Sequence, residues 1–265
     1  MKGNYKKEFE KVFNEIAYKH GHFQVFENFL DCTINGFCFN YCNNTMEAIR
    51  KRYNQNERHQ FGELIKYWIL ICKEEITTDN SWFDFFGTFY EANAISKQKG
   101  FAQFFTPSTI CDFMVKITDP INGESIAEPA CGSGRFNLAA HAQNPKLFHF
   151  ANDLDFTCVK MSALNFMIHG IKGVVTCDDT LSPPNTKFRN AFIVNDTIVP
   201  SLHFTTDYAF TQNYIEKKIN PNGRFQRKIK EVLNLINKEP MQAENIPIIE
   251  EFEPIVMQNG QISLF

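Results

Sequence analysis

The 265-residue sequence has no long hydrophobic run. Its longest apolar stretch, Tyr67–Cys72, spans six positions, whereas a membrane-spanning helix needs about 20. The first residues, MKGNYKKEFEKVF, contain no apolar segment of the kind found in secretory signals. We therefore expect a cytoplasmic protein that does not associate with a membrane.

Metal-binding cysteine patterns are also lacking. The eight cysteines form no Cys-x-x-Cys pair, and no set of cysteines and histidines has the spacing of a zinc site. For a protein expected in the cytoplasm, reduced thiols are the default state. The sequence therefore predicts no metal site.

Lysine and arginine are missing after Lys238, where five glutamates occur. The whole chain carries 27 basic and 30 acidic residues, so its formal net charge is −3 and residues 1–238 carry +2. A body so close to neutrality neither requires nor excludes nucleic acid as a partner. We predict that residues 239–265 form an acidic, flexible tail.

Helical periodicity dominates the first hundred residues. The patterns predict an all-helical domain over residues 1–99, with helices at 5–19, 23–34, 45–54, 57–76 and 80–97.

The next predicted domain, residues 100–238, alternates short apolar runs with helical patterns. Strands are expected at 125–127, 147–152, 174–176 and 191–194, and helices at 106–117, 133–143, 156–169 and 211–237. This alternation indicates an α/β fold with a parallel sheet and crossover helices.

A glycine-containing segment follows the first predicted strand. It reads Glu-Pro-Ala-Cys-Gly-Ser-Gly over residues 128–134, and its two glycines allow a tight turn and close approach of a ligand. Asp153 follows the second strand, 19 residues after Gly134, a spacing suited to ribose hydroxyls. Asn137 stands at the third glycine position of the dinucleotide fingerprint, which disfavours a nicotinamide cofactor.

Four segments occur in an order that resembles the N6-adenine DNA methyltransferases related to the modification subunits of type I restriction systems. They are GFAQFFTP at 100–107, EPACGSG at 128–134, NDLD at 152–155 and DDTL at 178–181. The resemblance covers roughly residues 5–200. It implies a Rossmann-like, S-adenosylmethionine-dependent methyltransferase sheet, shortened at its C-terminal end or completed by a partner, after an N-terminal helical domain.

The same resemblance implies a binding site for S-adenosylmethionine. Thr106 would bond the methionine carboxylate, Glu128 would lie near the ammonium group, and Asp153 would accept the ribose hydroxyls. Leu154 would pack on the adenine, and Asp179 would accept a hydrogen bond from its amino group. The remaining cofactor residues implied by the resemblance are Pro107, Ala130, Cys131, Gly132, Ser133 and Gly134.

The catalytic motif of the family is altered in this sequence. The family has Asn-Pro-Pro followed by Tyr or Phe after its fourth strand, and the asparagine orients the amino group of a flipped base. Here the strand at 191–194 is followed by Asn-Asp-Thr-Ile, so Asn195 is the candidate catalytic residue while the prolines and the aromatic ring are lost. Three functions stay open: an adenine-specific DNA methyltransferase, a methyltransferase that acts on RNA or on protein glutamine, or a catalytically inactive cofactor-binding protein that acts as a regulator or decoy.

The last five residues, Gln-Ile-Ser-Leu-Phe, resemble the pentapeptide with which bacterial replication and repair proteins dock on the DNA sliding clamp. Leu264 and Phe265 would fill an apolar pocket, and Gln261 would hydrogen-bond at its rim. The resemblances therefore imply DNA, a specificity or modification subunit and the sliding clamp as partners.

Overall fold

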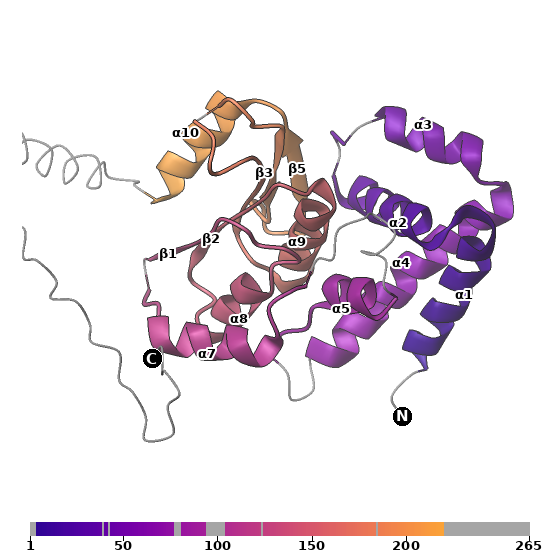
Figure 1. Cartoon of the computed structure of the whole chain (residues 1–265), viewed down its shortest axis with the longest axis horizontal. Coiled ribbons are helices and arrows are strands. Elements are labelled where there is room, and N and C mark those ends of the chain that lie inside the picture. The colour runs from indigo at the N-terminus through magenta and orange to yellow at the C-terminus, as the bar shows by residue number, and fades with distance from the viewer. Residues whose placement is uncertain are drawn as a thin grey trace, which may run out of the picture. The chain divides into compact units, whose positions relative to one another are not determined.

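The structure, a computed structural model, describes residues 4–38, 40–41, 43–76, 81–93, 104–122, 124–183 and 185–219 (Figure 1). The chain up to Ile219 forms one compact unit. The predicted acidic tail, with Gln261, Leu264 and Phe265, lies outside the described residues. So does the predicted domain boundary at residue 99, and both stay predictions.

The N-terminal region is helical, as its periodicity predicts. Its helices are α1 (Tyr5–His20), α2 (His22–Phe37), α3 (Asn43–Arg52), α4 (Gln55–Ile76) and α5 (Phe85–Ala92). Helix α5 begins later than residue 80 because Asp84 caps it, accepting a hydrogen bond from the Gly87 amide at 2.8 Å. Phenylalanine rings fill the space between these helices, with ring centroids 4.9 Å apart for Phe9 and Phe85.

The sheet is mixed, with the order β1-β2-β3-β4-β5. Strands β1 (Ser125–Glu128), β2 (Phe148–Asp153) and β3 (Gly173–Cys177) are parallel and are joined through helices α8 (Arg135–Gln143) and α9 (Phe156–His169). This part confirms the predicted α/β fold with crossover helices. Strand β4 (Asn190–Val194) runs antiparallel to β3, and β5 (Leu202–Thr205) runs antiparallel to β4, so the prediction of a parallel sheet is wrong beyond β3.

The reversal after β3 has a local cause. A parallel connection needs a crossover of a dozen or more residues, usually a helix. The link 178–189 shows turns and no helix in its described residues, so the chain returns along β3. As a result Val194 at the end of β4 pairs with Gly173 at the start of β3. Residues that follow β4 therefore lie at the sheet edge opposite to the carboxyl ends of β1 and β2.

Helices cover both faces of the sheet (Figure 1). Val175 belongs to a core that includes α9 and the N-terminal helices, whereas Val174 contacts a cluster that includes Tyr214 of α10 (Tyr208–Ile219). Helix α7 (Ser108–Thr118) packs against α8. It begins after Pro107, which occupies its N-cap position, so the helix starts two residues later than predicted.

A buried ion cluster joins α2 to α9. Lys160 is only 3 % exposed, and its Nζ lies 2.7 Å from Glu27 Oε2 and 2.9 Å from Asp31 Oδ1. Glu27 also accepts a hydrogen bond from Thr157 Oγ1, and Asp31 accepts one from the Tyr41 hydroxyl. Because a buried charge is costly unless it is paired, this cluster requires the helical region and the sheet to pack together.

Within the described ranges, no helix is long and apolar enough to cross a bilayer. The seven cysteines in these ranges are free thiols. The same part of the chain brings together no cluster of histidine, cysteine or carboxylate side chains that could hold a metal ion.

Replacing Lys160 by Met tests the ion cluster. We expect K160M to lower the free energy of unfolding by about 3–5 kcal/mol, because Glu27 and Asp31 lose the buried ammonium group that pairs with them. The matched control is K6M, which removes a partly exposed pair with Glu75 and is expected to cost less than about 1 kcal/mol. Urea denaturation of the three proteins measures both values, and equal losses for the two variants would contradict the prediction.

Candidate functional site

A cavity of about 240 Å³ opens at the carboxyl ends of β1 and β2. Glu128 ends β1, Asp153 ends β2, and the segment 104–106 closes one side. Seven of the predicted cofactor residues line this cavity: Thr106, Glu128, Ala130, Cys131, Gly132, Ser133 and Asp153.

Backbone geometry explains the two glycines of the loop after β1. Gly132 has φ +54° and Gly134 has φ +88°, a left-handed conformation that favours glycine. A Cβ atom on Gly132 would lie 2.7 Å from Cδ1 of Phe105, so the ring of Phe105 rests directly on the loop. The Gly132 amide donates to Asp153 Oδ2 at 2.9 Å, which fixes the loop against the end of β2.

Two carboxyl groups make the cavity electronegative. Burial raises the pKa of Glu128, and the charge of Asp153 raises it further. Burial also raises the pKa of Asp153, although hydrogen bonds from the Asp155 and Gly132 amides act in the opposite direction. Because burial is the main cause of both shifts, a cationic group beside these carboxyls would stabilise their ionised forms.

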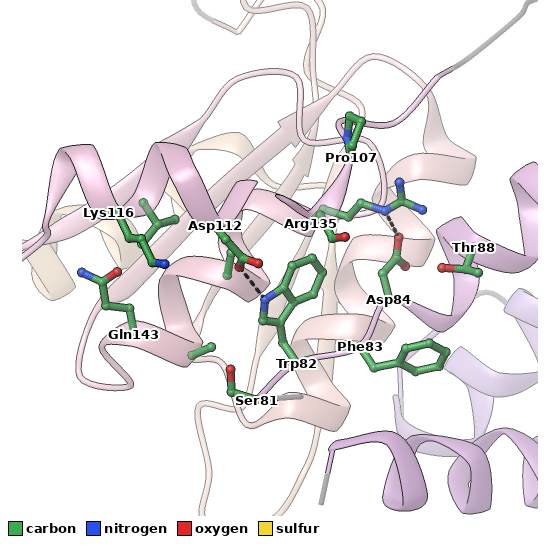
Figure 2. A pocket seen from close by; sticks show the side chains of 14 residues that line it. Ser81, Trp82, Phe83, Asp84, Thr88, Pro107, Asp112, Lys116, Arg135 and Gln143 are labelled. Atoms are coloured by element: carbon green, nitrogen blue, oxygen red, sulfur yellow. Dashed lines mark hydrogen bonds and ion pairs between the residues drawn. The ribbon is translucent and has the colours of Figure 1, made fainter. Parts of the chain in front are cut away.

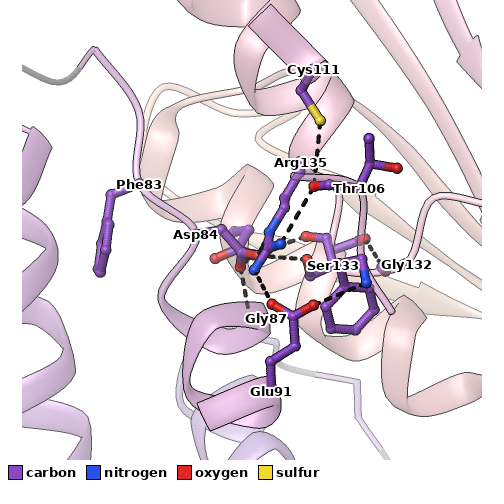
Figure 3. A network of polar contacts seen from close by, with 12 residues as sticks. Phe83, Asp84, Gly87, Glu91, Thr106, Cys111, Gly132, Ser133 and Arg135 are labelled. Atoms are coloured by element: carbon purple, nitrogen blue, oxygen red, sulfur yellow. Dashed lines mark hydrogen bonds and ion pairs between the residues drawn. The ribbon is translucent and has the colours of Figure 1, made fainter. Parts of the chain in front are cut away.

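A polar network that the sequence analysis missed supports the loop from the helical region (Figure 3). Asp84 accepts hydrogen bonds from Ser133 Oγ at 2.6 Å and from Arg135 Nε at 2.7 Å. Glu91 of α5 accepts from Arg135 Nη2 at 2.7 Å and from the Phe105 amide at 3.0 Å. An Asp before a helical run is a recognisable cap signal for Asp84, but no local pattern singles out Glu91.

The other predicted cofactor residues do not line this cavity. Gly134 caps α8 and packs on Ser162 and Phe166. Leu154 lies in the loop after β2 and is 63 % exposed. The Asp179 carboxylate accepts hydrogen bonds from the Leu181 amide and the Ser182 hydroxyl, which lower its pKa.

Asn195, the predicted catalytic residue, lies at the opposite edge of the sheet. Its side chain is buried, and its Nδ2 lies within hydrogen-bond distance of the carbonyl oxygens of Phe166, Met167 and Ile171 at 2.9–3.2 Å. Its Oδ1 accepts from the Ser201 amide. The structure therefore does not bring Asn195 to the cavity, because the reversal after β3 carries the end of β4 away from it.

A second, larger cavity of about 700 Å³ lies between the segment 81–84 and helices α7 and α8 (Figure 2). Trp82 donates its indole N–H to Asp112 across this space at 3.0 Å. Pro107 is the predicted cofactor residue that lines it, and Arg135 borders both cavities.

A parallel strand pair, a glycine-containing loop and an acidic residue at the end of the second strand are features that nucleotide-binding proteins of the α/β class share. Comparison of the sequence with known families is more specific. Residues 81–260 match the N-6 DNA Methylase family, and the chain belongs to this family.

Individual relatives share only part of their length with the chain. The Type I restriction enzyme MjaIX methylase subunit of Methanocaldococcus jannaschii is 27% identical over 156 residues, which cover 53% of this chain and 27% of the relative. A solved modification subunit of a putative type I restriction enzyme from Vibrio vulnificus YJ016 aligns with a TM-score of 0.30 at 20% identity, over 53% of this chain and 28% of that structure. The chain thus spans about a quarter of the length of either protein.

The contact between α5 and the loop predicts a severe effect of one added methyl group. In G87A, the Cβ atom would overlap Asp84 Oδ2 and Ser133 Oγ, so we expect a loss of about 1–3 kcal/mol in the free energy of unfolding. The matched control is G62A in α4, where the added atom meets open space and is expected to stabilise by about 0.5–1 kcal/mol. Urea denaturation measures both variants, and a neutral G87A would show that the contact is not tight.

Proposed function

We propose that the chain binds S-adenosylmethionine in the cavity at the ends of β1 and β2 and that it acts in methylation of adenine N6 in DNA. The observation that carries the proposal is the presence of Thr106, Glu128, Gly132 and Asp153 in one cavity. Membership of the N-6 DNA Methylase family supports the reaction class.

The residues present fit this cofactor by charge and by position. Glu128 and Asp153 would meet an ammonium group and a pair of ribose hydroxyls, and the Gly132 loop borders the cavity with the Phe105 ring resting on it. The cavity is smaller than the roughly 300–1,000 Å³ of common ligand sites, so the ligand would also lie against the rim at Phe104 and Met114. When bound, S-adenosylmethionine supplies an electrophilic methyl group.

A second candidate function is binding of the cofactor without methyl transfer, as in a regulatory or decoy protein. The position of Asn195 favours it, since the side chain that would orient the target amine is committed to three carbonyl oxygens at the other sheet edge. Incubation with labelled cofactor and mixed-sequence DNA separates the two functions. Labelled N6-methyladenine in the DNA supports the methyltransferase. If the chain binds the cofactor but the DNA stays unlabelled even when a specificity subunit is supplied, the second candidate is supported.

Further partners and the location also belong to this proposal. We propose DNA and a specificity or modification subunit as partners, because the relatives are named as subunits of type I restriction enzymes. The last five residues support docking on a sliding clamp, and the composition supports a cytoplasmic location.

Calorimetric titration with S-adenosylmethionine tests the cofactor site. We expect saturable binding to the native chain and at least about tenfold weaker binding to D153N, which loses the ionised acceptor at the ribose position. Affinity should fall as the pH is lowered, and the fall should begin at a higher pH than for ordinary exposed carboxylates, because burial raises the pKa of Glu128 and of Asp153. The matched control is D196N, which changes a residue at the opposite sheet edge. Equal affinities of D153N and the native chain for S-adenosylmethionine would contradict the assignment.

Substitution of Asn195 separates a structural role from a catalytic one. We expect N195A to lose about 1–3 kcal/mol of unfolding free energy, because buried carbonyl oxygens lose their donor. Its affinity for S-adenosylmethionine should equal that of the native chain. A variant with native stability that loses methyl transfer would instead show that Asn195 takes part in the reaction.

A further inference from the structure

Arg135 introduces a positive charge into an otherwise electronegative cavity. Among the described residues that line the cavity, Glu128 and Asp153 are the acids and Arg135 is the basic residue. The lining therefore presents both signs of charge, and the two carboxylates that pair with Arg135, those of Asp84 and Glu91, lie outside the lining. This matches a ligand that carries a carboxylate, an ammonium group and a further positive charge.

The guanidinium group is held in place but not saturated. Arg135 Nε bonds Asp84, and Nη2 bonds Glu91, each at 2.7 Å. Nη1 reaches the Thr106 carbonyl oxygen at 3.4 Å, which is longer than the usual 2.7–3.2 Å. An arginine has five N–H donors. Within the described part of the chain, two strong hydrogen bonds and this long contact use three of them.

The position of the remaining donors is fixed by the surroundings. The side chain of Arg135 is 11 % exposed, and its guanidinium lies 5.5 Å from the centre of the Phe105 ring. Figure 3 shows the group between Asp84 and Glu91, with Thr106 next to it. A rigid, partly dehydrated arginine beside Thr106 is suited to bind a carboxylate, to which it would donate charge-assisted hydrogen bonds.

We propose that Arg135 binds the carboxylate of the amino-acid portion of the methyl donor, and that Asp84 and Glu91 position it for this role. The inference rests on the proposed function, since it assigns one end of the same ligand. It makes Arg135 a specificity-determining residue that distinguishes an amino-acid nucleoside from a nucleoside without the carboxylate.

The test compares two ligands that differ only in this group, S-adenosylmethionine and its decarboxylated analogue. By calorimetry the native chain should bind the first at least about tenfold more tightly. R135Q should lose this preference, whereas R135K, which keeps the charge, should retain part of it. R58Q, which changes an exposed arginine of α4 outside the cavity, should keep the full preference.

Because the preference is a ratio measured on one protein sample, a loss of stability in R135Q affects both ligands equally. A native chain that binds both ligands equally well, or an R135Q variant that keeps the preference, would overturn the inference. A native chain that binds neither ligand would instead refute the proposed function. Thermal unfolding without ligand confirms that each variant is folded.

Discussion

The buried carboxylate of Asp84 is the constraint on which the site depends. It is 3 % exposed and accepts hydrogen bonds from the Gly87 amide, Ser133 Oγ, Arg135 Nε and Asn165 Nδ2. A buried charge is tolerated only when such partners satisfy it, so α5, the glycine-containing loop, α8 and α9 must meet at one point. The loop that forms the cavity wall thus depends on the N-terminal helical region for its shape.

Helix α9 shows the same interdependence at the level of packing. Its residues from Thr157 to Met167 are all buried, because the sheet lies on one side and the N-terminal helices lie on the other. The ion cluster of Lys160 adds directional contacts to this apolar interface. Cys158 of α9 lines the cavity, so this packing also holds part of the cavity wall in place.

The antiparallel return of β4 separates two elements that the sequence motifs would combine. Glu128 and Asp153 stand at the carboxyl ends of parallel strands, where ligands bind in α/β sheets. Asn195 stands at the other edge and stabilises the end of α9 through backbone carbonyl oxygens. The presence of asparagine at position 195 therefore does not by itself place its side chain where the motif requires it.

Local sequence patterns determined the helices of the N-terminal region, the strand–loop–helix unit around Gly132 and the acidic end of β2. These features depend on hydrophobic periodicity, on glycine's access to positive φ and on short sequence spacing. Only the tertiary structure decided the direction of β4, the place of Asn195 and the contacts of Asp84 and Glu91 with Arg135. Those outcomes depend on which separate segments share a buried position. The ion pairs of Arg135 with Glu91 and Asp84 join residues 44 and 51 positions apart, and strand pairing joins Gly173 to Val194.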